Sequence, residues 1–201
     1  MFDLFNNKDD KKWKIIIDYN KTAKHYDSRY YNIQNAKYNV SIKGISLINK
    51  LILDGGCGTG LFFEFLIKNE VSNLIKNFTY IGIDVSIKML EIFKEKLLKI
   101  QFKKRIKSDL ILSDIENLPF REASFDAIFT FTSIQNLSNP LRGIRELLYT
   151  GKNNGFWISS ILKKKMNEKI QKELKLSLRD LKIINLEDLE DIIYIGFIKK
   201  N

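Results

Sequence analysis

The stretch Leu51-Ile52-Leu53-Asp54-Gly55-Gly56-Cys57-Gly58-Thr59-Gly60 decides the fold of this 201-residue chain. Its apolar start predicts a buried parallel strand, and the residues from Leu61 to Leu66 predict a helix directly after it. The glycines at positions 56, 58 and 60 predict the turn between them, because that backbone bends sharply and lets a ligand approach without a Cβ atom in the way. In doubly wound α/β sheets, such a turn lies where nucleotide-like cofactors bind.

The spacing of these glycines excludes two common nucleotide-binding loops. The dinucleotide pattern G-x-G-x-x-G requires a glycine at position 61, where the chain has Leu61. A phosphate-binding loop requires a lysine after the glycines, and none follows here. The observed pattern, D-x-G-x-G-x-G, resembles the first motif of the class I S-adenosylmethionine (SAM) dependent methyltransferases, and a tight turn without a ligand is the alternative. The resemblance assigns cofactor binding to Asp54, Gly56, Cys57, Gly58 and Gly60.

A second buried strand, over residues 78–84, ends in Asp84, which lies 24 residues after Gly60. In nucleoside-binding α/β folds an acid at this strand end accepts hydrogen bonds from the ribose hydroxyls. A carboxylate suits this role because it is an acceptor only. Asp84 and the adjacent Val85 are therefore predicted to bind the cofactor. The alternative for Asp84 is the N-cap of the next helix, predicted from Ser86 to about Ile100.

A third apolar strand ends at Asp114, and the residues from Asp114 to Phe120 resemble the D-x-x-x-L-P-F stretch of the same family. The resemblance implies that Asp114 accepts a hydrogen bond from the adenine amino group and that Ile115 flanks the base. A turn acid that faces solvent is the alternative. In the fourth strand, the resemblance places the main-chain carbonyl of Thr130 against the amino group of SAM.

Two further regions are predicted to face the methyl acceptor. Residues 1–44 are predicted to form a mostly helical N-terminal lid, whose tyrosine-rich segment, with Tyr26 and Tyr31, is similar to the lid of many small methyltransferases. Gln135 and Asn136 follow the fourth strand, where many relatives carry polar groups that face the substrate. Helix packing by the tyrosines and capping by the amides are the alternatives. No residue is assigned a catalytic role.

Composition limits the compartment and the partners. Cys57 is the only cysteine, so an internal disulfide or a cysteine-based zinc cluster is excluded, and no metal site is predicted. The first ten residues lack the pattern of a signal peptide and no apolar run approaches a membrane span, so a cytoplasmic protein without a membrane partner is expected. The net charge of +10 fits an RNA substrate, and a lysine excess from A/T-rich codon usage is the alternative.

Two missing features narrow the acceptor. Methylases of exocyclic amines and glutamine amides usually carry [ND]-P-P-[YF] after the fourth strand, where this chain reads Thr132-Ser133-Ile134-Gln135. Methylation of RNA cytosine at C5 requires a cysteine nucleophile, and Cys57 is part of the glycine turn. Both acceptor classes are therefore disfavoured.

Five predicted strands alternate with helices and precede a terminal hairpin, which predicts a three-layer α/β sandwich. The fifth strand is predicted over 156–162 after a turn at 151–155, and a lysine-rich helix is predicted from about Lys163 to Ser177. The resemblance implies a Rossmann-like, seven-stranded, mostly parallel sheet of order 3-2-1-4-5-7-6 with the last-added strand antiparallel. A single methyltransferase domain is expected over 1–201, with the SAM-binding core over 45–201.

The predicted function is SAM-dependent methyl transfer to an RNA or a protein. The lid looks like that of small archaeal-type methyltransferases, and some of these are associated with tRNA or translation factors and with a small zinc-binding activator subunit. The alternatives are a small-molecule methyltransferase of the quinone-biosynthesis type and a SAM-binding module without activity.

Overall fold

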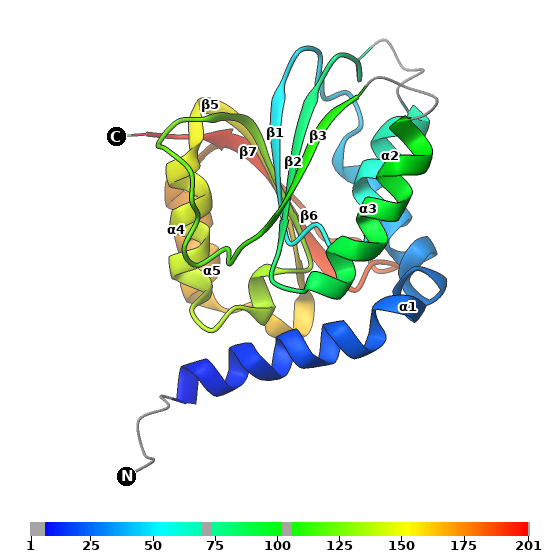
Figure 1. The fold of residues 1–201 in the computed structure, drawn as a ribbon. Coiled ribbons are helices and arrows are strands. Elements are labelled where there is room, and N and C mark those ends of the chain that lie inside the picture. The colour runs from blue at the N-terminus through cyan, green and yellow to red at the C-terminus, as the bar shows by residue number, and fades with distance from the viewer. Residues whose placement is uncertain (1–6, 70–73, 102–105, 201) are drawn as a thin grey trace.

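The computed structural model describes residues 7–69, 74–101 and 106–200. Its centre is a seven-stranded sheet in the order β3-β2-β1-β4-β5-β7-β6 (Figure 1). Strands β1 to β5 are parallel, and β7 pairs antiparallel with both β5 and β6. The predicted strand order and the antiparallel last-added strand are confirmed. The first six residues of the predicted lid lie outside the described residues.

The five parallel strands end at the same edge of the sheet. Strand β1 lies near the centre, paired with β2 and β4, and its Ile52 and Leu53 are fully buried. Because the strands run in one direction, the polar residues that follow their carboxyl ends gather at one edge. The bounds are β1 Leu51–Gly55, β2 Thr79–Asp84, β3 Lys107–Leu112, β4 Phe125–Phe131 and β5 Gly151–Leu162.

Helices cover both faces of the sheet (Figure 1). Helices α2 and α3 lie on one face, where the buried ring of Phe93 belongs to a cluster rich in aromatic residues. Helices α4 and α5 lie on the other face, over a second cluster that contains Leu147 and Trp157. Two separate apolar cores therefore hold the sheet in place. The bounds are α2 Leu61–Asn69, α3 Ile87–Gln101, α4 Pro140–Thr150 and α5 Glu168–Ser177.

Helix α1 (Asn7–Ser41) lies across the edge at which the parallel strands end (Figure 1). Its C-terminal part joins the core of the α2 and α3 face through Tyr38, and Ile42, directly after the helix, belongs to the same core. Its N-terminal part continues past the loops that follow the strands, so the helix covers that edge. None of the described helices has the length and apolar character needed to cross a membrane.

The helix predicted from Lys163 starts later than predicted. Residues Lys163–Lys165 form a short 3-10 helix, η2, and α5 begins at Glu168. The Asn167 side-chain oxygen accepts a hydrogen bond from the Ile170 N–H at 3.0 Å and caps the new helix. The prediction was wrong at this end because lysines fit a helix and a turn equally well, and the cap fixes where the helix starts.

The fifth strand is longer than predicted, because the turn expected over 151–155 is a bulge within it. Strand β5 begins at Gly151 opposite Phe125, and the pairing then continues with Phe156 opposite Ala127. Residues 152–155 therefore bulge out of the ladder. The chain continues into a hairpin of β6 (Leu178–Ile184) and β7 (Asp191–Ile198).

Candidate functional site

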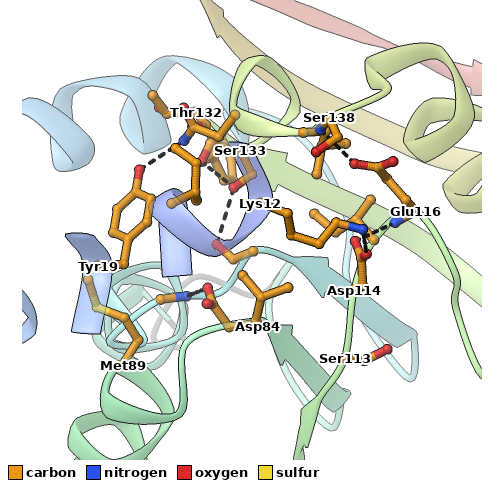
Figure 2. A pocket seen from close by; sticks show the side chains of 18 of the residues that line it. Lys12, Tyr19, Asp84, Met89, Ser113, Asp114, Glu116, Thr132, Ser133 and Ser138 are labelled. Atoms are coloured by element: carbon orange, nitrogen blue, oxygen red, sulfur yellow. Dashed lines mark hydrogen bonds and ion pairs between the residues drawn. The ribbon is translucent and has the colours of Figure 1, made fainter. Parts of the chain in front are cut away.

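A pocket opens at the carboxyl edge of the sheet, beneath helix α1. The space there that protein atoms do not fill, open solvent at its mouth included, is about 720 Å³. Its walls come from the glycine turn after β1, from the loops after β2, β3 and β4, and from α1 (Figure 2). Of the residues predicted to bind a cofactor or the acceptor, the pocket is lined by Tyr26, Gly56, Gly58, Asp84, Val85, Asp114, Ile115 and Asn136.

The glycine turn is held by main-chain hydrogen bonds to strand β2. The N–H groups of Gly56 and Cys57 both donate to the Ile83 carbonyl at 2.9 Å. Gly56 has a φ of +81°, and a Cβ atom there would lie 2.1 Å from the Ser133 Oγ. A Cβ atom on Gly58 would meet no protein atom within 4 Å. The turn therefore packs against the loop after β4 at Gly56 and leaves open space at Gly58.

Asp84 links the glycine turn to the start of helix α3. Its Oδ2 accepts from the Gly58 N–H at 2.9 Å, and its Oδ1 accepts from the Ser86 N–H at 2.8 Å. Burial raises the pKa of the Asp84 carboxyl, and these hydrogen bonds oppose the rise. The Ser86 Oγ accepts from the Met89 N–H at 3.2 Å and caps the helix itself. Asp84 is thus left to line the pocket (Figure 2).

Asp114 lines the same pocket from the end of β3 and contacts an unpredicted residue of α1. Its Oδ1 accepts from the Glu116 N–H at 2.9 Å, and its Oδ2 lies 2.5 Å from the Lys12 Nζ (Figure 2). Ile115 is buried and forms part of the wall. Lys12 was missed because it precedes Asp114 by 102 residues, and nothing in the local pattern of a helix names a distant partner.

The residues predicted around β4 fall into two groups. Thr130 is fully buried within the strand and lines neither this pocket nor the smaller cavity behind the glycine turn. The pocket wall is made instead by Phe131, Thr132 and Ser133, which follow it. Thr130 lies within β4, whereas these three residues form the end of the strand and the start of the loop, where the chain turns at Thr132 with a φ of +56°.

The structure separates the four residues predicted to face the acceptor. Tyr26 and Asn136 line the pocket, and the Asn136 Nδ2 donates to the Tyr19 hydroxyl at 2.8 Å. Tyr31 is exposed, and its hydroxyl accepts from the Lys68 Nζ at 2.9 Å. Gln135, in the short 3-10 helix η1 (Ile134–Asn136), is buried and its Nε2 donates to the Thr132 carbonyl at 2.6 Å. Tyr19 was not predicted.

Helix α1 contacts all four loops around the pocket. Beside the Lys12 and Tyr19 contacts, the Asn20 Oδ1 accepts from the Ser86 Oγ at 2.7 Å. The Asp27 carboxylate accepts from the Thr59 hydroxyl of the glycine turn.

Among the described residues, no group of three or more His, Cys, Asp or Glu side chains could hold a metal ion.

Asp54 is buried behind the glycine turn and lies outside the main pocket. It lines the smaller cavity together with Cys57 and accepts a hydrogen bond from the Tyr80 hydroxyl. Burial raises the pKa of the Asp54 carboxyl to about 7, which the Tyr80 hydrogen bond only partly offsets. In the native protein this carboxyl therefore keeps its proton well above pH 4.

This raised pKa predicts that the wild type loses stability as the pH rises. Between pH 4 and 7 the folded state holds a proton on Asp54 that the unfolded state has lost, so the free energy of unfolding falls as the pH rises to 7. Asp54→Asn should remove this pH dependence. The free energy of unfolding of the variant, relative to that of the wild type, should therefore rise by roughly 2–3 kcal/mol from pH 5 to pH 8. Urea unfolding of both proteins at pH 5 and pH 8 tests this prediction. The same change in the free energy of unfolding for the two proteins would contradict it.

The sequence of this core matches a known domain model. The model for a methyltransferase domain matches residues 53–159, which is more than half of the chain. The chain belongs to the methyltransferase domain family. This confirms the resemblance to the class I SAM-dependent methyltransferases, whose cofactor is SAM.

Three curated relatives show how wide this family is. The protein MJ1252 of Methanocaldococcus jannaschii is 32% identical over 157 residues, covering 75% of this chain and 53% of the relative. The 18S rRNA (guanine(1575)-N(7))-methyltransferase of Saccharomyces cerevisiae is 29% identical, covering 61% and 42%. The demethylmenaquinone methyltransferase of Thermotoga maritima is 34% identical, covering 47% and 36%. The chain thus spans about half the length of the curated relatives it matches, or less.

Solved structures share the fold over most of their length. A SAM-dependent methyltransferase from Aquifex aeolicus superposes with a TM-score of 0.67 at 19% identity, covering 89% of this chain and 98% of the other. A methyltransferase in complex with the Trm112 activator of Haloferax volcanii gives a TM-score of 0.64 at 12% identity, covering 90% and 98%. At identities this low, the superpositions establish the shared fold alone.

Proposed function

We propose that this chain binds SAM in the main pocket and transfers its methyl group to an RNA. The observation that carries the proposal is that the glycine turn, Asp84 and Asp114 all line one pocket. These groups fit an adenosyl cofactor, because Gly58 borders open space and the two carboxylates can accept from the ribose hydroxyls and the adenine amino group. The bound cofactor supplies an activated methyl group on a sulfonium.

The residues of this chain bind and orient the reactants. Alignment of the acceptor with the methyl carbon can replace on the order of 7–11 kcal/mol of entropic cost in favourable systems. Helix α1 lines the pocket with Ile15, Tyr19 and Tyr26, and such a cover would limit the access of water to the reacting atoms. Ser133 and Asn136 line the pocket beside the cover and can orient the acceptor.

Charge near the pocket supports an RNA acceptor. Lys164 and Lys165 are exposed just after the carboxyl end of β5, and Lys11 and Lys14 are exposed on α1. Helix α1 crosses the edge of the sheet where the parallel strands end (Figure 1), so the segments that carry these lysines lie at the same edge of the sheet as the pocket. A positive border around a pocket attracts a polyanion. The rRNA-modifying relative from yeast acts on such a substrate.

Incubation with radiolabelled SAM and separated RNA, protein and lipid fractions tests the acceptor class. We expect label in the RNA fraction and RNA affinity that falls steeply with salt. The double variant Lys164→Gln/Lys165→Gln should lower the magnitude of the slope of log affinity against log salt by about 1.4 to 1.8. Lys152→Gln/Lys199→Gln is the matched control, because it removes the same charge at the opposite edge of the sheet. Label confined to protein, or equal slopes for the two variants, would contradict an RNA acceptor.

A small apolar molecule is the second candidate acceptor. The relative from Thermotoga maritima is a demethylmenaquinone methyltransferase, and the Tyr19 and Tyr26 rings form an aromatic wall, with centroids 6.4 Å apart. Label in the lipid fraction would favour this candidate.

The assay also includes a small activator subunit, because the Haloferax volcanii protein of similar fold was solved with its activator Trm112. Turnover only with such a subunit would add the activator to the proposed function.

A further inference from the structure

A buried ion pair lies behind the loop that follows β4. The Nζ of Lys37, from helix α1, is 2.9 Å from the Oδ1 of Asp191, the first residue of β7. Both side chains are almost completely buried, with 2% and 0% of their surface exposed. A buried pair of charges pays a large desolvation cost, and apolar residues of similar size often stabilise a fold as well or better. Stability alone is therefore a weak reason for charges at this position.

Both partners of the pair contact Thr132. The Lys37 Nζ donates to the Thr132 Oγ1 at 2.7 Å, and the Thr132 hydroxyl lies 2.9 Å from the Asp191 Oδ2. The Ser160 Oγ donates to the same Asp191 oxygen at 2.8 Å. The Thr132 side chain is therefore enclosed by one cation, one carboxylate and one hydroxyl, each supplied by a different element.

Thr132 needs such support because its backbone is strained. Its φ of +56° lies in the left-handed region, which a β-branched residue rarely adopts. Such a conformation is energetically costly and persists only where the surroundings enforce it. The contacts from Lys37, Asp191 and Ser160 supply that enforcement from the side away from the pocket.

The conformation of Thr132 sets the positions of the polar groups in the pocket. Its carbonyl accepts from the Gln135 Nε2 at 2.6 Å and from the Asn136 Nδ2 at 3.2 Å. Asn136 also contacts Tyr19 on the cover. The next residue, Ser133, lies against the glycine turn, with its Oγ 3.4 Å from the Gly56 carbonyl. A change at Thr132 would therefore move the groups that face the acceptor.

We propose that Lys37 and Asp191 are positioning residues for methyl transfer, which act by fixing Thr132 and, through it, Ser133 and Asn136. The inference rests on the proposed function, since it assigns the fixed groups to the acceptor side of the SAM pocket. It predicts that loss of the ion pair loosens the loop after β4 and slows turnover while SAM affinity is retained.

The test replaces the pair by apolar residues in Lys37→Met/Asp191→Leu. This double variant should melt near the wild-type temperature, because it leaves no unpaired buried charge. Amide hydrogen exchange over residues 132–137 should be at least tenfold faster. The kcat for methyl transfer from labelled SAM to the RNA fraction should fall at least tenfold. The Kd for SAM by calorimetry should stay within twofold. Lys152→Met is the matched control, because it breaks a lysine–carboxylate pair with Asp126 at the other end of β4.

Exchange and turnover separate this inference from the proposed function. A wild type that methylates no fraction would refute the function, and the exchange rates of residues 132–137 would still decide the role of the pair. If the double variant has the same exchange rates and kcat as the wild type, the inference is overturned and the pair has only a structural role. If the double variant does not fold, Asp191→Asn, which preserves volume, should accelerate exchange at least threefold, and exchange within twofold of wild type would overturn the inference.

Discussion

Alanine in place of Asp84 should weaken SAM binding about 10- to 150-fold. Hydrogen bonds to a charged acceptor contribute roughly 1.5–3 kcal/mol, and about 1.4 kcal/mol corresponds to a tenfold change in affinity. Asp84 lines the pocket and its carboxylate can accept from the ribose hydroxyls at the end of β2. Isothermal titration calorimetry with SAM measures the loss directly.

A structural role of Asp84 must be separated from a ribose contact, because the same carboxylate holds the Gly58 and Ser86 N–H groups. A 2′-deoxy analogue of the cofactor makes this separation. The wild type should prefer the parent cofactor, and Asp84→Ala should lose most of that preference. Glu91→Ala is the control, since it removes an exposed acid of helix α3. Equal SAM affinity for the Asp84 variant and the wild type would refute the ribose assignment.

Gly60→Ala should destabilise the protein by about 2–5 kcal/mol. Gly60 has a φ of +82°, and a Cβ atom there would lie 2.3 Å from a ring carbon of Phe93. That ring is fully buried and packs against Phe63 and Tyr80, with centroids 5.5 and 6.0 Å away. It has no free space to move into, so the clash adds to the backbone strain.

Gly44→Ala is the matched control for this prediction. Gly44 has a similar φ of +78°, and a Cβ atom there would meet nothing within 4 Å. Its substitution should cost only the backbone strain, about 1–2 kcal/mol. Unfolding in urea gives both free energies, and the difference between them isolates the contact with Phe93. Equal losses for the two variants would show that the aromatic packing around Gly60 adapts to the methyl group.

Features that lie close together in the sequence were predictable. The glycine turn follows β1, Asp84 ends β2 and Asp114 lies two residues after β3, so the position of each was set by its own strand. Parallel strands bring their carboxyl ends to one edge, and this rule was enough to place the three features around one pocket. The strand order followed from the resemblance that these same residues carry.

Local sequence by itself thus determined the individual parallel strands, the turn and the two carboxylates of the pocket, because each depends on neighbours within one strand and its loop. Only the tertiary structure decided which side chains meet across the chain. Lys12 reaches Asp114 over 102 residues, and Lys37 reaches Thr132 over 95. Both lysines belong to helix α1, whose placement over the sheet edge depends on packing with distant elements. The periodicity of a helix shows which residues share a face, and the partner of that face is chosen only when the whole chain has folded.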